Sequence, residues 1–132
     1  MDWTNIGAPS LDEVEWLARA QYATLPASFR NLCGDILFMV QEFPDEDVIR
    51  DLDLDSEFDI LGLFQGPTLA ERTGHTDRPE PTVIFLYRRP ILDFWAEQQG
   101  VLGAIVRHVI VHEIGHHFGL SDDDMERIEK EA

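Results

Sequence analysis

The chain has 132 residues, and its 26 acidic residues against 10 Lys and Arg give a formal net charge of −16. At this length we expect one domain over residues 1–132 with a buried hydrophobic core. The charge disfavours nucleic acid and anionic membrane as partners, and no apolar run approaches the roughly 20 residues of a membrane span.

The cysteine content and the first residues of the chain indicate the cellular compartment of the protein. Cys33 is the only cysteine, which excludes an intramolecular disulfide. Residues 1–5 have neither the basic nor the apolar region of a secretory signal. We therefore expect a cytoplasmic protein, whose oligomeric state the sequence leaves open.

Two helices are predicted before the first strand. Residues 10–20 form the first, with Ser10 as N-cap, because Glu13 three residues later completes a capping box. A second, short helix is predicted over residues 26–31. The β-prone run over residues 36–43, which Pro44 stops, then predicts a strand.

Residues 45–59 are densely acidic. Alternate aspartates from Asp51 onward resemble the opening of a calcium-binding EF-hand loop. However, Ser56 and Gly62 stand where that loop needs Gly and Glu, so the calcium interpretation fails twice. We expect a solvated helix or loop here.

The middle of the chain predicts two further strands, over residues 61–65 and 82–87, and a short helix over residues 91–98. The loop between the strands, residues 66–81, is the best candidate for a segment near a cleft, where Glu71, Arg72 and His75 could contact substrate. Helices and strands followed by a helical end indicate an α+β fold, with a sheet of about three strands packed on helices.

The most informative motif is H-E-x-x-H, formed by His112, Glu113 and His116. Residues four apart lie on one face of a helix, about 6 Å apart along its axis, so the two imidazoles can bind one metal ion. Zinc with three protein ligands keeps an open position for water, and a neighbouring carboxylate can take the proton of that water. The motif predicts His112 and His116 as ligands of Zn²⁺ and Glu113 as the base, although imidazole also suits iron, nickel and copper.

The neighbours of the motif support a motif helix. Residues 101–111 are apolar at helical spacing, and Gly119 tolerates the positive φ at which such a helix ends. The alternative is an ordinary core helix that happens to carry histidines. His117 is rotated about 100° from His116 and is not expected to bind the metal, and His108 is expected to pack or line a cleft.

The extended motif H-E-x-x-H-x-x-G-x-x-D resembles that of metzincin-type proteases, which implies that Asp122 is the third ligand. In the alternative interpretation, Ser121 caps a final helix and Asp122 belongs to its acidic first turn. Asp123 or Glu126 would then be the oxygen donor for zinc.

The segment from Leu61 onward resembles the small bacterial zincin-like metallopeptidase family, on the residues around 61–66 and 69–72, the Leu-Tyr-Arg-Arg-Pro-Ile-Leu run over 86–92, and the motif. This resemblance implies a minimal single-domain zincin with a small sheet packed on the motif helix. It also implies a zinc-dependent peptidase that acts on a peptide or protein substrate.

One departure from larger zincins leaves other functions open. Ten residues follow Asp122, too few for a second subdomain that would form the far wall of a deep cleft. A group that stabilises the oxyanion must then come from upstream, and the candidates are Tyr87, Arg88, Arg89 and His75. The alternatives to a peptidase are a zinc-stabilised binding or regulatory module with little or no turnover, and a hydrolase of non-peptide amides.

Overall fold

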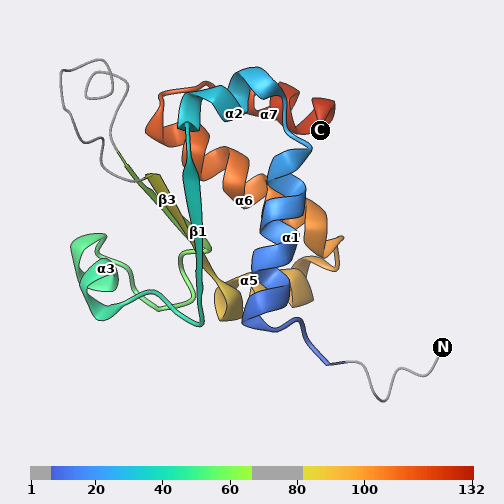
Figure 1. Cartoon of the computed structure of the whole chain (residues 1–132). Helices are drawn as coiled ribbons and strands as arrows, with labels where there is room; N and C mark the ends of the chain where they lie inside the picture. The colour runs from blue at the N-terminus through green and yellow to red at the C-terminus, as the bar shows by residue number, and fades with distance from the viewer. Residues whose placement is uncertain (1–6, 67–81) are drawn as a thin grey trace.

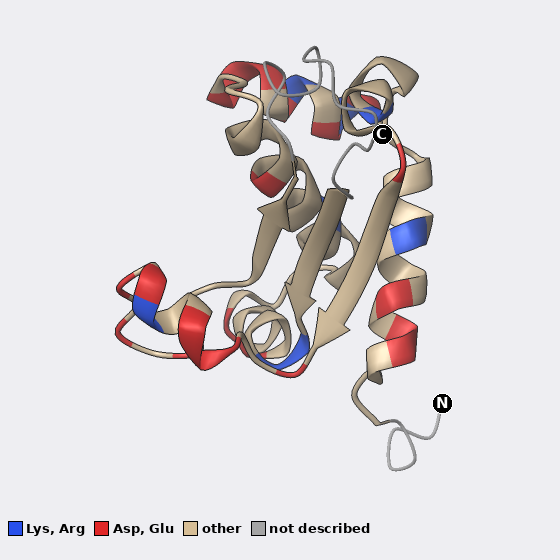
Figure 2. Cartoon of the chain, turned by 60° about the vertical axis from the view of Figure 1, so that its left-hand side comes forward, with Lys and Arg blue, Asp and Glu red and all other residues tan. Residues whose placement is uncertain are grey.

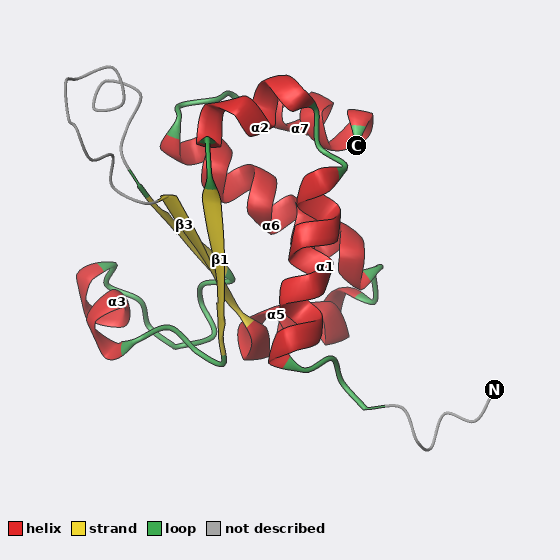
Figure 3. Ribbon diagram, in the orientation of Figure 1, coloured by secondary structure: helices red, strands yellow, loops and turns green. Residues whose placement is uncertain are grey.

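The computed structural model describes residues 7–66 and 82–132. Within them, the helices are α1 (Leu11–Ala23), α2 (Ala27–Cys33), α3 (Glu46–Asp51), α5 (Arg88–Gln98), α6 (Leu102–His117) and α7 (Asp122–Glu131). The strands are β1 (Ile36–Gln41), β2 (Gly62–Gln65) and β3 (Thr82–Tyr87). These helices and one small sheet confirm the α+β class (Figure 3). No helix of the described part has both the length and the apolar character to cross a membrane.

The three strands form one mixed sheet in the order β1-β3-β2. β1 runs parallel to β3, with Ile36 opposite Thr82, and β2 runs antiparallel to β3, with Gly62 opposite Leu86. Among the described residues, β2 is therefore an edge strand, and of the three strands it makes the most extensive contact with α6. The sequence could not tell which strand lies at the edge beside the motif helix.

The hydrophobic core lies between the sheet and the helices α1 and α6, which cover one face of the sheet (Figure 1). Ala18 of α1, Ile84 of β3 and Ile110 of α6 are fully buried in it. Burial of such apolar side chains provides most of the folding free energy, so α6 is fixed to the sheet by its own core face. The opposite face of α6 does not pack in the core and is available for a functional site.

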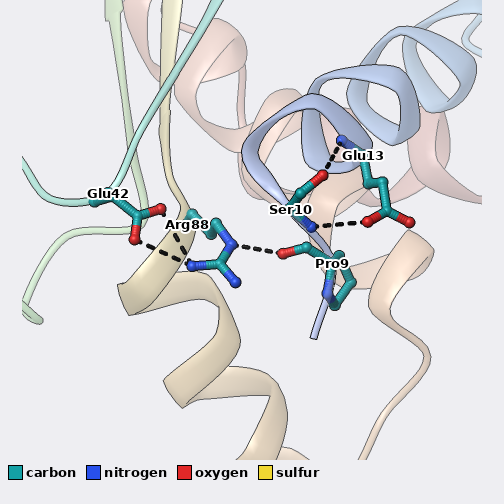
Figure 4. Close-up of polar contacts among 5 residues, drawn as sticks. All are labelled: Pro9, Ser10, Glu13, Glu42 and Arg88. Carbon is teal, nitrogen blue, oxygen red and sulfur yellow. Dashed lines mark hydrogen bonds and ion pairs between the residues drawn. The ribbon is translucent and has the colours of Figure 1, made fainter. Parts of the chain in front are cut away.

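The predicted N-cap of the first helix is confirmed. The Ser10 hydroxyl accepts from the Glu13 amide at 3.1 Å, and the Glu13 carboxylate accepts from the Ser10 amide at 3.0 Å (Figure 4). α1 continues to Ala23, three residues past the predicted end.

Arg88, at the junction of β3 and α5, ties three distant segments together (Figure 4). Its Nε donates to the Pro9 carbonyl at 2.5 Å, and its Nη1 lies 3.1 and 3.2 Å from the two carboxylate oxygens of Glu42. These contacts hold the start of α1 and the segment after β1 against the start of α5. The Arg88 guanidinium is therefore used in the scaffold.

Several predicted boundaries are wrong by two or three residues. β1 ends at Gln41 rather than residue 43, and α5 begins at Arg88 rather than residue 91. Pro90 is tolerated inside α5 because it lies in the first turn, where backbone N–H groups have no helical partner. The acidic segment contains the solvated helix α3, whose acidic residues lie at the lower left of Figure 2. The predicted substrate-contacting residues Glu71, Arg72 and His75 lie outside the described residues.

Gly62 lets β2 approach α6 closely. A Cβ at this position would lie 2.8 Å from Cγ1 of Val109 and 2.9 Å from the Phe85 carbonyl oxygen. Because the second neighbour is backbone, we expect Gly62→Ala to lower the free energy of unfolding by about 1–3 kcal/mol, the usual cost of overpacking. Urea denaturation measures this change. Gly7→Ala is the matched control, since its Cβ would meet nothing within 4 Å, and equal stability of the two variants would contradict the prediction.

Candidate metal centre

Helix α6 carries three histidines along one stripe. Val106, Ile110 and Ile114 point into the core, which leaves His108, His112 and His116 on successive turns of the other face. The ring centroids of His108 and His112 are 3.9 Å apart, and those of His112 and His116 are 5.6 Å apart. The helical spacing therefore places the two predicted zinc ligands as neighbours, with His108 as a third imidazole beside them.

The end of α6 turns the chain back sharply. Gly119 has φ +74°, as predicted, and the Leu120 amide donates to the Gly115 carbonyl at 2.8 Å. The Gly119 amide donates to the His116 carbonyl at 3.2 Å, which completes a Schellman motif. After this turn, Ser121 caps α7, and its hydroxyl accepts from the Asp124 amide at 3.1 Å.

α7 then runs back along α6, because Gly115 allows close contact. A Cβ at Gly115 would lie 2.7 Å from Cγ of Met125, a side chain that is fully buried. One turn after Met125, Glu129 reaches the histidine stripe. Its Oε1 lies 2.9 Å from Nδ1 of His108 and 3.2 Å from Nε2 of His112.

The structure thus brings together a set of potential ligands that the sequence did not predict. His108, His112 and Glu129 each offer an atom within 4.8 Å of the others, and they are the only such group of three or more in residues 7–66 and 82–132. The predicted set of His112, His116 and Asp122 does not meet this distance limit. Its role as a ligand set stays a prediction.

Asp122 occupies the place that the alternative interpretation gave it, in the acidic first turn of α7 behind its cap Ser121. This position does not separate it from the histidines. Its charge is near enough to raise the pKa of His112, although less strongly than Glu129 does. Asp122 therefore lies within electrostatic reach of the motif.

The sequence holds a partial signal for Glu129, although its contact with the histidines depends on how α7 packs on α6. Met125 and Glu129 are four residues apart and share one face of a predicted helix. A turn as short as Gly119-Leu120-Ser121 folds that helix back along the motif helix. The apolar Met125 then meets α6 first, and Glu129 follows one turn nearer the start of α6, where His112 lies.

Burial shifts the pKa values of two residues of the motif, His112 and Glu113. Burial lowers the pKa of His112, helped by the nearby His108 and His116 and opposed by Glu129 and Asp122. A neutral imidazole is the form that binds a metal. Burial raises the pKa of Glu113, and the charge of His116 opposes this rise only in part. A carboxylate whose pKa is shifted toward neutrality is suited to accept and return a proton.

The residues predicted as candidates to stabilise the oxyanion differ in whether other contacts already engage their side chains. The Arg88 guanidinium is engaged by Glu42 and Pro9, and that of Arg89 lies 5.8 Å above the centre of the Phe43 ring. Tyr87 is buried, and the charge of Glu113 acts on its pKa. His75 lies outside the described residues. Among the described candidates, Tyr87 is the one coupled to the motif.

The phenol of Tyr87 has its pKa raised to about 12, first by burial and then by the charges of Asp45 and Glu113. Because the pKa of Tyr87 is higher in the folded than in the unfolded state, folding favours the neutral phenol. The stability that Tyr87 contributes is therefore complete below the unfolded pKa of about 10, and it is lost as the pH rises through about 12. We expect the stability of the wild type to fall over this range, and that of Tyr87→Phe to fall less. Urea denaturation at neutral pH and near pH 11 tests this, with Tyr22→Phe as the control that keeps Tyr87. Equal pH dependence in wild type and Tyr87→Phe would contradict it.

Two further features border the stripe. His117 packs its ring 4.4 Å from that of Phe64 on β2. His108 lines an apolar pocket of about 470 Å³, which confirms its predicted cleft-lining place. The other walls of this pocket include Leu61, Phe94, Val101, Ile105 and Val109. A bulky apolar group would fit beside His108.

Comparison with known proteins identifies a family for most of the chain. A family model described as zincin-like metallopeptidase matches residues 33–132, which include the whole sheet, α6 and α7. No curated protein matches the chain.

Proposed function

Since the chain belongs to the zincin-like metallopeptidase family, we propose that it is a zinc-dependent peptidase that hydrolyses peptide bonds in a peptide or protein substrate. The observation that carries this proposal is the pairing on α6 of a histidine stripe with Glu113, a partly buried carboxylate of raised pKa. A helix that merely packs in a core needs neither feature.

His112, His116 and Asp122 would hold the zinc. Imidazole nitrogen and carboxylate oxygen are donors that zinc accepts, and the lowered pKa of His112 favours the neutral ring that binding requires. Asp122 begins α7, directly after the turn that follows the motif. When bound, zinc supplies a Lewis acid that polarises a water molecule and the carbonyl under attack.

Glu113 would move the proton. Its carboxylate takes a proton from the attacking water and, as the carboxylic acid, returns it to the leaving amine when the C–N bond breaks. Burial raises its pKa, which strengthens it as a base in the first step and keeps the proton available for the second. General base catalysis of this kind contributes about 10²–10⁴-fold to the rate.

The sheet and the apolar pocket would bind the substrate. β2 contacts α6 and, among the described strands, pairs only with β3, so an extended peptide could add to its other edge. The pocket beside His108 would take a bulky apolar side chain of that peptide. The strong negative charge argues against nucleic acid or anionic membrane as a partner, and we propose a cytoplasmic location.

The experiment that tests this function combines metal analysis with cleavage of an unbiased peptide library. We expect about one zinc per chain in protein purified without added metal, cleavage that a chelator abolishes, and its return with zinc. One zinc without any cleavage would instead favour a zinc-stabilised binding module, which the three-ligand group of His108, His112 and Glu129 makes the second candidate. Cleavage of small amides alone would indicate a non-peptide substrate.

A further inference from the structure

We propose that His108, His112 and Glu129 form a metal-binding position of their own, for zinc or a similar divalent transition metal. This position includes neither His116 nor Asp122, so it goes beyond the proposed catalytic site and shares only His112 with it. Its existence does not depend on the proposed function. Only its consequence for activity does.

The distances between the donor atoms fit one metal ion. Oε1 of Glu129 lies 2.9 Å from Nδ1 of His108 and 3.2 Å from Nε2 of His112. Two ligands of a tetrahedral zinc ion, each at about 2.0–2.1 Å from the metal, lie about 3.3 Å from one another. Two imidazoles and a carboxylate are also a donor set found in catalytic zinc sites.

The unsatisfied oxygen of Glu129 is the second observation. Oε1 is buried, and it accepts no hydrogen bond from any described residue, despite the two ring nitrogens nearby. A buried carboxylate oxygen that accepts no hydrogen bond is costly while the neighbouring imidazoles are neutral, and a cation bound between the three groups would remove that cost. By contrast, Glu126 on the same helix pairs with Lys130, with 3.0 Å between Oε1 and Nζ, and both of these side chains are exposed.

The fold builds this group from two elements. His108 and His112 belong to α6, whereas Glu129 is delivered by α7 through the close packing of Met125 on Gly115. A salt bridge within one helix would need no such docking. The three donors therefore meet because the two helices are held together at Gly115.

The position would exclude the proposed catalytic one. Nε2 of His112 faces Glu129, and one ring nitrogen can bind only one metal ion. Helix geometry also places His108 and Glu113 on opposite flanks of His112. A metal held by His108 and Glu129 would thus lie away from the proposed base, in a resting arrangement that restrains hydrolysis.

Metal titration of four proteins tests this inference. The four proteins are the wild type, His116→Ala, and His116→Ala combined with either Glu129→Gln or Glu131→Gln. Calorimetry measures zinc affinity and stoichiometry, and Co²⁺ absorption reports on the ligands. The variant with Glu131→Gln is the matched control, since Glu131 is exposed on the same helix. Circular dichroism checks that each variant is folded.

We expect one metal ion per wild-type chain, because His112 is shared. His116→Ala should still bind one ion. Adding Glu129→Gln to His116→Ala should then weaken zinc binding by more than about 100-fold. A residue that only hydrogen-bonds to a metal ligand would cost about 10–100-fold. Adding Glu131→Gln should not change the affinity.

Three outcomes would overturn the inference: loss of all binding in His116→Ala, unchanged affinity on adding Glu129→Gln, or two ions per wild-type chain. Cleavage by the wild type and by Glu129→Gln alone is measured separately. Absence of cleavage would count against the proposed peptidase and would leave the binding result to decide this inference by itself. If both proposals hold, Glu129→Gln cleaves at least as fast as the wild type.

Discussion

Replacing Glu113 with Gln should lower kcat/KM for peptide hydrolysis by about 10²–10⁴-fold, the contribution of a general base. Gln keeps the size of the side chain but cannot accept the proton of the attacking water. The zinc content should stay the same, because the amide removes no proposed ligand. Kinetics on a cleaved peptide and elemental analysis of the same preparation measure the two effects together.

The same substitution should stabilise the protein at neutral pH. Burial raises the pKa of Glu113 above the ordinary value of 4.5, so the folded state favours its neutral form. The stability that this group contributes is complete below pH 4.5 and is lost as the pH rises through the folded-state pKa. Gln stays neutral throughout, and Glu113→Gln should therefore have the higher Tm at pH 7 and lose this advantage in acid.

Glu97→Gln is the matched control, since Glu97 is exposed on α5 and outside the proposed site. It should leave both kcat/KM and Tm unchanged. Full activity in Glu113→Gln with full zinc content would remove Glu113 from the mechanism. A lower Tm in that variant at neutral pH would show that the carboxylate is stabilised by a partner rather than strained by burial.

The parts of the fold that the sequence predicts are those held by local interactions. The caps Ser10 and Ser121 and the turn at Gly119 each depend on residues within a few positions, and the structure has all three. Helical periodicity likewise predicts that His112 and His116 lie one turn apart. Such features need no knowledge of the rest of the chain.

What the sequence missed depends on distant contacts. The Arg88 side chain binds the Pro9 carbonyl and Glu42, which lie far away in the sequence, so local patterns do not show that it joins three segments. Glu129 meets His108 and His112 only because α7 packs back along α6. Motif spacing alone therefore does not show that Glu129 lies beside His108 and His112.

That packing depends on Gly115, where we expect a second large effect. Gly115→Ala places a Cβ 2.7 Å from Cγ of Met125, so the Met125 side chain must move, and because it is fully buried we expect α7 to shift with it. Overpacking of this kind costs about 1–3 kcal/mol, more than the ~1 kcal/mol that Ala gains over Gly inside a helix. Because Asp122 and Glu129 move with α7, zinc affinity should fall as well. Urea denaturation and zinc titration measure the two losses.

Two comparisons isolate the contact between Gly115 and Met125. Gly103→Ala lies in the same helix, but its Cβ would meet first the flexible end of Gln21 at 3.1 Å, so it should lose neither stability nor zinc affinity and can gain from the helix propensity of Ala. Met125→Ala alone should cost about 2–5 kcal/mol through the cavity it leaves. Since the methyl group added by Gly115→Ala would occupy part of that cavity, the double variant should be more stable than the sum of the single losses predicts, by about 0.5–3 kcal/mol. Additive losses would mean that the two residues do not set the distance between α6 and α7, and the meeting of Glu129 with the histidines would need another cause.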